Sequence, residues 1–318
     1  MVYPVIFVIF IKFRLIKVSM KISVLIFAYN RKEYLLYSVK SALTQTLGRS
    51  EYEIIVVKNF KDNKIDKFLT ENNIKTILKD GTIGEYIKEG ITQSNTNIIC
   101  FLDDDDLFEQ NKLETVINKF NDNSDLCYFH NNFDVITDNN SSIKVRNHAP
   151  DFNMSCISIN LDKIDISKIE DITTSQDTFL YLKALDSKNK IICSVEKLTE
   201  YRVHNSTSNS YTSNLNEFNS KNQQYIEQIL GNFKLFSRTI KSKKAVNYLN
   251  AQITNWTISL YTYNFKERPS KIINFLVYNN VSVQNTLSKL LIYTLIRLHF
   301  KKLILYIQKM RYNNQIRI

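Results

Sequence analysis

Four consecutive carboxylates, Asp103 to Asp106, directly follow the apolar run Ile98 to Leu102. Adjacent acids repel one another, so the cluster is costly unless a cation neutralises it. Carboxylate oxygens favour Mg²⁺ or Mn²⁺, and a diphosphate can complete the coordination. The alternative is an acidic turn that caps a helix beginning near Glu109. A single Asp would suffice for a cap, and the apolar run places the acids at a strand end, so a metal site is favoured.

The segments expected to position this acidic cluster alternate between the hydrophobic pattern of a strand and that of a helix. Short apolar runs predict strands at 22–27, 54–57, 74–78 and 98–102. Three- and four-residue spacing predicts helices at 34–43, 65–69 and 83–91. This alternation predicts right-handed crossovers and a mostly parallel sheet, in which ligands bind beyond the carboxyl ends of the strands. Polar clusters at 28–31, 58–59 and 103–106 should therefore converge on one rim.

The pattern loosens after Asn121 but continues as one domain. Strands are expected at 126–129, 156–159, 191–194 and 198–203, with a helix at 175–185. From Leu215 onward, helical periodicity predicts a separate C-terminal helical segment. The predicted fold class is α/β: a Rossmann-like, mostly parallel sheet flanked by helices, followed by helices.

Composition favours a globular protein with a basic tail. The 318 residues are 44% apolar, which can furnish a sizeable core. The four cysteines are scattered singly, so buried thiols in a reducing compartment are expected. Of the net charge of +11, the tail from Ser210 carries the excess, with 16 Lys and Arg against 3 Asp and Glu. Such a tail is suited to an anionic surface, either lipid head groups or nucleic acid.

Both termini leave alternatives open. The apolar residues Met1 to Phe10 are too few to span a bilayer, so residues 1–20 are either an N-terminal extension or lie upstream of a true start at Met20. A basic, apolar-rich helix is expected at 287–310, either lying in a membrane interface or packed on the preceding domain. Aromatic residues of the tail follow helical spacing and do not alternate with Lys and Arg, so no nucleic acid is expected as a partner.

Several segments resemble a known family. Ile22 to Arg31 reads Ile-Ser-Val-Leu-Ile-Phe-Ala-Tyr-Asn-Arg, and Ser41 to Thr46 reads Ser-Ala-Leu-Thr-Gln-Thr. With the acids at 102–106, these segments resemble the family 2 glycosyltransferases of GT-A fold over roughly residues 21–208. The resemblance implies a nucleotide-sugar-binding half at 21–120 and an acceptor-binding half at 121–210. The basic helical region at 211–318 lies outside it.

The resemblance also assigns roles. Asp103 and Asp105 occupy the two DxD places, and the family's Tyr-Arg-x-His segment is similar to Tyr201 to His204, so the implied metal ligands are Asp105, Asp103 and His204. A structural hydrogen-bonding role is the alternative for His204. Where the family usually has Asp-Asp-Gly-Ser, this chain has Lys58-Asn59-Phe60-Lys61. Asn59 can still bond a base edge, and Lys58 could meet a phosphate. The implied donor-binding residues are Ala28, Tyr29, Arg31, Asn59, Asp103 and Asp104.

Asp177 is the expected general base. The segment from Thr174 to Phe179 resembles the family's Glu-Asp segment at the start of the acceptor-side helix, with Gln176 in place of the first acid. An inverting transfer needs such a base to accept the proton of the attacking hydroxyl. The alternative is a first-turn residue favoured by the helix dipole.

The expected protein is an inverting glycosyltransferase dependent on Mg²⁺ or Mn²⁺. It would use a nucleotide-sugar donor and a glycan or polyisoprenoid-linked acceptor, and would be cytoplasmic, peripheral at the inner face of the cell membrane. The alternatives are a catalytically inactive scaffold of the same fold and a basic-tailed nucleic-acid-binding protein.

Overall fold

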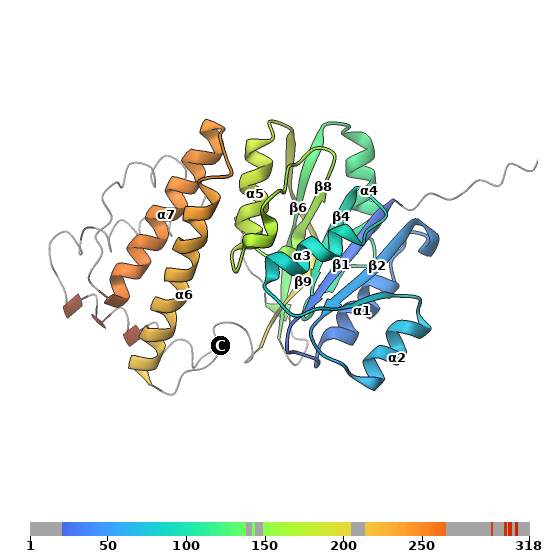
Figure 1. Ribbon diagram of the computed structural model, residues 1–318, viewed down its shortest axis with the longest axis horizontal. Helices are drawn as coiled ribbons and strands as arrows, with labels where there is room; N and C mark the ends of the chain where they lie inside the picture. Colours follow the sequence, from blue (N-terminus) through green and yellow to red (C-terminus); the bar gives the residue numbers. More distant parts are fainter. Residues whose placement is uncertain are drawn as a thin grey trace, which may run out of the picture.

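The computed structural model describes residues 21–137, 142–143, 149–204 and 214–264, with a few isolated positions beyond 290. Within these residues one sheet of nine strands has the order β3-β2-β1-β4-β8-β6-β9-β5, with β7 paired to β6. Helices cover both faces of the sheet, and α6 and α7 lie beside α5, on the side away from α2 (Figure 1). The predicted α/β fold class is confirmed.

The first half is a parallel sheet around β1. β1 pairs in parallel with β2 and β4, and β3 pairs in parallel with β2. Every residue of β1 is buried, which explains its unbroken apolar run, because a central parallel strand is covered on both faces. The elements are β1 (Ile22–Ala28), α1 (Leu35–Leu43), β2 (Tyr52–Lys58), α2 (Asn63–Glu71), β3 (Lys75–Leu78), α3 (Ile83–Thr92) and β4 (Ile98–Asp103).

The second half is mixed in direction, so the sheet is less parallel than expected. β8 is antiparallel to β4 and β6, β5 is antiparallel to β9, and β6 is parallel to β9. The strands expected at 191–194 and 198–203 form a single strand, β9, whose pairing with β6 contains register shifts near His130 and Asn132. The elements are β5 (Leu107–Phe108), α4 (Lys112–Asp122), β6 (Leu126–Thr137), β7 (Ser142–Ile143), β8 (Ile157–Asn160), α5 (Gln176–Asp186) and β9 (Lys190–Val203).

The helices α6 (Leu215–Phe236) and α7 (Lys243–Asn264) are part of the same hydrophobic core and not a separate segment. Thr178 to Leu185 of α5 are all buried, so this helix needs cover on the side away from the sheet. The Phe236 ring lies 5.2 Å from that of Phe179, and the Tyr248 ring lies 5.0 Å from that of Tyr181. The first C-terminal helices therefore supply the missing cover.

Two further predictions concern the ends of the chain. The extension at 1–20 lies outside the described residues, as does most of the helix expected at 287–310. Among the helices that are described, none is both long and apolar enough to cross a membrane.

Candidate active site

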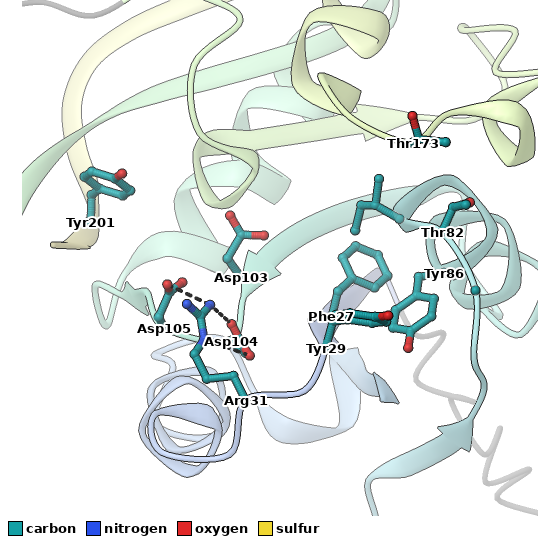
Figure 2. A pocket seen from close by; sticks show the side chains of 12 residues that line it. Phe27, Tyr29, Arg31, Thr82, Tyr86, Asp103, Asp104, Asp105, Thr173 and Tyr201 are labelled. Carbon is teal, nitrogen blue, oxygen red and sulfur yellow. Dashed lines mark hydrogen bonds and ion pairs between the residues drawn. The ribbon is translucent and has the colours of Figure 1, made fainter. Parts of the chain in front are cut away.

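A cavity of about 560 Å³ opens at the carboxyl ends of β1 and β4. Figure 2 shows the acids near its middle, between the paired rings of Tyr29 and Tyr86 and the single ring of Tyr201. The predicted convergence of the Ala28–Arg31 turn with the Asp103–Asp106 turn is therefore present. The lining residues are Phe27, Tyr29, Arg31, Gly81, Thr82, Ile83, Tyr86, Asp103, Asp104, Asp105, Thr173 and Tyr201.

Asp103, the last residue of β4, directs its carboxylate into this cavity (Figure 2). Its backbone N–H donates to Ser155 Oγ at 2.9 Å, which fixes the strand end. Among the described residues, no side chain hydrogen-bonds or ion-pairs with its carboxylate. Burial, with the charges of the neighbouring acids, raises the pKa of Asp103 well above its usual range. The group is therefore available to a cation or a hydroxyl brought by a ligand.

Asp104 and Asp105 share one guanidinium. Arg31 Nη2 ion-pairs with Asp104 and lies 2.7 Å from Asp105 Oδ2, while Arg31 Nε donates to Asp104 Oδ2 at 3.3 Å. Burial raises the pKa of Asp104 to about 6, against the opposing effect of Arg31. Arg31 thus neutralises part of the cluster from the end of β1.

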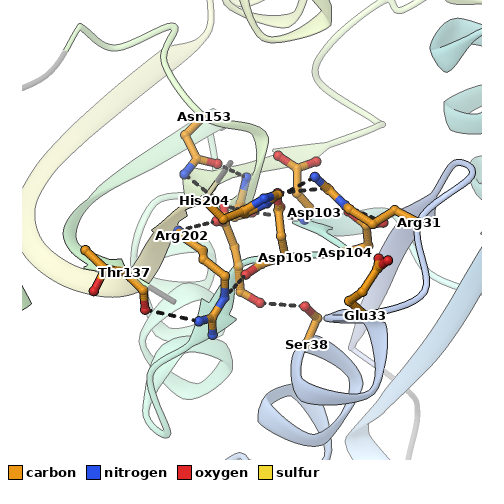
Figure 3. Close-up of polar contacts among 12 residues, drawn as sticks. Arg31, Glu33, Ser38, Asp103, Asp104, Asp105, Thr137, Asn153, Arg202 and His204 are labelled. Atoms are coloured by element: carbon orange, nitrogen blue, oxygen red, sulfur yellow. Dashed lines mark hydrogen bonds and ion pairs between the residues drawn. The ribbon is translucent and has the colours of Figure 1, made fainter. Parts of the chain in front are cut away.

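His204, just after β9, completes this group. Its Nε2 lies 3.0 Å from Asp105 Oδ2 and 3.2 Å from Arg31 Nη1 (Figure 3). Its ring also packs on Tyr34, with centroids 4.7 Å apart. The two chain segments predicted to act together, separated by 99 residues, therefore meet at one carboxylate oxygen.

Asp106 is held inside the protein by hydrogen bonds and does not line the cavity. Its buried carboxylate accepts from Asn153 Nδ2 at 3.0 Å, Ser155 Oγ at 2.7 Å and the Arg202 backbone N–H at 2.9 Å. Burial and the charge of Asp105 raise its pKa to about 7. Arg202 Nε donates to the Asp105 carbonyl at 2.9 Å, so its side chain holds the acidic turn.

Asp177 lies in the first turn of α5, two residues after Ser175, whose φ is 60°. Its Oδ1 accepts from the Thr178 backbone N–H at 2.8 Å. Burial, followed by the charge of Asp151, raises the pKa of Asp177 to about 7. The charge of Asp177 also contributes to the raised pKa of Asp103, so the ionisation of one carboxylate opposes that of the other.

The predicted donor-side residues fall into two groups. Tyr29 is 56% exposed and meets Tyr86 edge-on, with centroids 6.1 Å apart. Ala28 is fully buried, and the Asn59 amide exchanges two hydrogen bonds of 2.8 Å with Asn30. Ala28 and Asn59 therefore position the turn that carries Tyr29.

Two other polar residues, Lys58 and His130, are not among the residues that line the cavity. Lys58 is buried on Asp66 at 2.8 Å, so it is not placed to meet a phosphate. His130 Nε2 bonds the Phe152 carbonyl at 2.8 Å, which gives this side chain a structural contact.

Sequence reasoning missed the far wall of the cavity, made by Gly81, Thr82 and Tyr86. Thr82 and Glu85 form a reciprocal capping box at the start of α3, a pattern visible in the sequence as Thr-x-x-Glu. Gly84 packs so closely on the distant turn Ile169–Asp171 that a Cβ would meet the Ile169 carbonyl at 2.0 Å. The capping box could have placed the start of α3, whereas the close packing depends on residues far along the chain.

The family described as Glycosyl transferase family 2 matches residues 23–188, more than half of the chain. The chain belongs to this family.

Relatives of this family 2 chain include named bacterial glycosyltransferases. WfgD of Escherichia coli, a UDP-Glc:alpha-D-GlcNAc-diphosphoundecaprenol beta-1,3-glucosyltransferase, is 26% identical over 67% of this chain and 86% of its own length. The minor teichoic acid biosynthesis protein GgaA of Bacillus subtilis is 36% identical over 31% of this chain. TarP of Staphylococcus aureus, a poly(ribitol-phosphate) beta-N-acetylglucosaminyltransferase, is 28% identical over 33% of this chain. The matches span only 25% of GgaA and 34% of TarP.

Solved structures agree on the fold. TarS 1-349 of S. aureus in complex with UDP-GlcNAc superposes with a TM-score of 0.53 at 15% identity, covering 85% of this chain and 81% of that one. This likeness shows a GT-A-type architecture.

The described residues contain no group of three His, Cys, Asp or Glu side chains arranged to hold a metal ion.

Proposed function

We propose that this protein is a metal-dependent, inverting glycosyltransferase that moves a sugar from a nucleotide diphosphate to a glycan or lipid-linked acceptor. The observation that carries the proposal is the meeting of Asp103, Asp104, Asp105, Arg31 and His204 beside a cavity large enough for a nucleotide sugar. The family membership and the named activities of WfgD and TarP support the transfer of a glycosyl group.

In this proposal the donor lies with its nucleobase at the tyrosine end of the cavity and its diphosphate at the acids. Tyr29 and Tyr86 offer apolar surface for a nucleobase, and Arg31 and the acids lie where a cation-bound diphosphate would follow. The TarS complexes with UDP and UDP-GlcNAc make uridine diphosphate sugars the first donors to test.

Asp105 and His204 would hold Mg²⁺ or Mn²⁺, with Asp103 beside them. Asp105 Oδ2 and His204 Nε2 lie 3.0 Å apart, so both atoms would be within reach of one ion. When bound there, the ion would supply charge stabilisation to the departing diphosphate. Because the Arg31 guanidinium contacts the same two atoms, it would have to give way to the ion.

Asp177 is proposed as the general base. Its carboxylate accepts the proton of the acceptor hydroxyl while that oxygen bonds to the anomeric carbon. The bond from that carbon to the diphosphate oxygen breaks, and its electron pair leaves with the nucleotide diphosphate. A pKa of about 7 matches a base that works near neutral pH.

The acceptor and the location are proposed on charge and on relatives. WfgD is named for a diphosphoundecaprenol substrate. The excess of Lys and Arg after Ser210 suits a lipid surface bearing anionic head groups. We therefore propose peripheral attachment at the cytoplasmic face of the membrane.

The test is a thermal shift measurement with nucleotide diphosphates and their sugars in Mg²⁺, Mn²⁺ or EDTA. A nucleotide at 100 times its Kd adds about 2.7 kcal/mol to the free energy of unfolding. We expect one nucleotide to stabilise the wild type only with metal. Asp105→Asn should lose this effect, and Asp122→Asn, which changes an exposed acid on α4, should keep it. If no nucleotide stabilises the wild type with either metal, the proposal fails and an inactive scaffold is favoured.

A further inference from the structure

Arg31 contacts three neighbouring side chains at once, among them the two atoms proposed to hold the metal. Its Nε and Nη2 donate to the two oxygens of Asp104, and Nη2 also lies 2.7 Å from Asp105 Oδ2. Its Nη1 lies 3.2 Å from His204 Nε2 (Figure 3). A guanidinium is a rigid fork of donors that keeps its positive charge, so it can neutralise carboxylates in the place of a metal ion.

His204 Nε2 cannot satisfy both of its neighbours in this arrangement. It lies 3.0 Å from an oxygen of the Asp105 carboxylate and 3.2 Å from an Arg31 nitrogen, which can only donate. If Nε2 carries a hydrogen, it donates to Asp105, and its N–H faces the guanidinium N–H. If Nε2 carries none, it accepts from Arg31, and its lone pair faces the carboxylate. A metal ion in place of the guanidinium would satisfy the ring nitrogen and the carboxylate oxygen together.

Arg31 also covers the way from the cavity to His204. The side chain of His204 is 1% exposed, whereas that of Arg31 is 23% exposed. Arg31 and Asp105 line the cavity, and His204 is not among its lining residues. A cation that enters from the cavity therefore meets the guanidinium before it meets the ring nitrogen. Two positive charges beside one carboxylate repel each other, so the ion should bind weakly while Arg31 is in place.

A diphosphate offers Arg31 another partner. Among the described residues that line the cavity, Arg31 is the one with a basic side chain. A diphosphate that lies beside the acids therefore has Arg31 as its cationic contact. A guanidinium pairs with phosphate oxygens through two parallel hydrogen bonds, as it does with a carboxylate. An Arg31 side chain that turns to the phosphate leaves Asp105 and His204 to the metal ion.

We propose that Arg31 is a built-in counter-ion, which holds the metal position in the free protein and yields it to a divalent ion when a nucleotide diphosphate draws the guanidinium away. Metal and nucleotide then bind cooperatively, because each alone must displace Arg31, whereas the two together displace it once. The inference rests on the proposed function, since it takes a nucleotide diphosphate as the donor and Mg²⁺ or Mn²⁺ as its partner.

The first measurement is Mn²⁺ binding to the full chain without nucleotide, followed by the electron paramagnetic resonance signal of free Mn²⁺. Arg31→Gln should bind Mn²⁺ at least about tenfold more tightly than the wild type. Adding Asp105→Asn to this variant should remove the gain, which places the ion at Asp105. Lys32→Gln is the matched control, because it removes a neighbouring charge that pairs with Asp62 and does not line the cavity.

Three results of this measurement would overturn the inference. The first is an equal Mn²⁺ affinity for the wild type and Arg31→Gln. The second is a gain that survives Asp105→Asn, since the ion would then bind elsewhere. The third is a gain of the same size in Lys32→Gln, since the effect would then follow from net charge and not from the contacts of Arg31.

The second measurement is the affinity for UDP, by equilibrium dialysis in Mn²⁺ and in EDTA. In the wild type, Mn²⁺ should tighten UDP binding at least about tenfold, and Arg31→Gln should reduce this factor severalfold. An unchanged factor in Arg31→Gln would overturn the inference. A wild type whose UDP affinity does not depend on Mn²⁺ would overturn it without recourse to a variant.

These data also separate the two proposals. A wild type that binds UDP with Mn²⁺, together with an Arg31→Gln variant that behaves identically, contradicts only the role of Arg31. A wild type that binds no nucleotide diphosphate with either metal contradicts the proposed function itself. An Arg31→Gln protein that still binds UDP with Mn²⁺ is folded, so its Mn²⁺ affinity is informative.

Discussion

Replacing Asp177 by Asn should remove activity and stabilise the protein at alkaline pH. The pKa of Asp177 is raised from 3.8 to about 7, chiefly by burial. A group whose pKa is raised on folding destabilises the native state when ionised, and this cost grows as pH rises from the unfolded toward the folded pKa. The Asn variant carries no charge at any of these pH values, and its side-chain oxygen can still accept from the Thr178 N–H.

The size of the effect follows from the shift. One pKa unit corresponds to about 1.4 kcal/mol, so a rise from 3.8 to about 7 amounts to about 4 kcal/mol well above both pKa values. Part of this cost is already present at pH 5, and Asp177 is partly open to solvent. We therefore expect the advantage of Asp177→Asn in free energy of unfolding to grow by about 1–3 kcal/mol between pH 5 and pH 8.

Urea unfolding at pH 5, 6, 7 and 8 in EDTA, followed by circular dichroism, measures this difference. Asp125→Asn, at an exposed acid before β6, is the control and should show no comparable growth with pH. Transferase activity of Asp177→Asn should fall by about 10²- to 10⁴-fold if the carboxylate is the base. A stability difference that stays constant over this pH range would refute the raised pKa and the argument built on it.

Three further predictions concern the parts that frame the site. Gly84→Ala should lower the free energy of unfolding by about 1–3 kcal/mol, because its Cβ would meet the Ile169 carbonyl at 2.0 Å. Gly231→Ala, with open space around its Cβ, should raise the free energy of unfolding by about 0.5–1 kcal/mol. Urea unfolding compares the two variants. Asp106→Asn should cost about 2–4 kcal/mol, since an amide cannot accept from all three hydrogen-bond donors around this buried group, and equal urea midpoints for variant and wild type would contradict this. Arg31→Gln should lower the melting temperature more in EDTA than in Mn²⁺, because without the guanidinium only a metal ion can offset the charge of Asp104 and Asp105. An equal fall in melting temperature in both buffers would contradict the expectation that Mn²⁺ can replace Arg31 in neutralising these acids.

Much of the first half could be predicted from the sequence. The apolar run of β1 indicated a strand buried on both faces, and the structure buries all seven of its residues. The acids at 103–106 were placed at the end of β4 by the run before them, and Tyr29 and Arg31 at the end of β1. These features depend on neighbours in the chain, so local periodicity is enough to find them.

The second half was predicted less well. The strands expected at 191–194 and 198–203 form one strand because register shifts in its pairing with β6 absorb the irregular pattern between them. The helices α6 and α7 were expected to stand apart, yet they cover α5. The sequence of a helix that is buried on every side does not indicate which elements pack against it. Such a helix has no polar face to mark the side exposed to solvent.

The sequence by itself determined the parallel half-sheet, the acidic turn at its rim and the family. Only the tertiary structure divided the work of the four acids: Asp103 faces the cavity, Asp104 and Asp105 share Arg31, and Asp106 is held by three buried donors. It also brought His204 to Asp105 across 99 residues and turned Lys58 inward to Asp66. The physical reason is that hydrophobic period fixes which side of an element is buried, whereas the partner of a charged group depends on distant segments that meet only when the chain has folded.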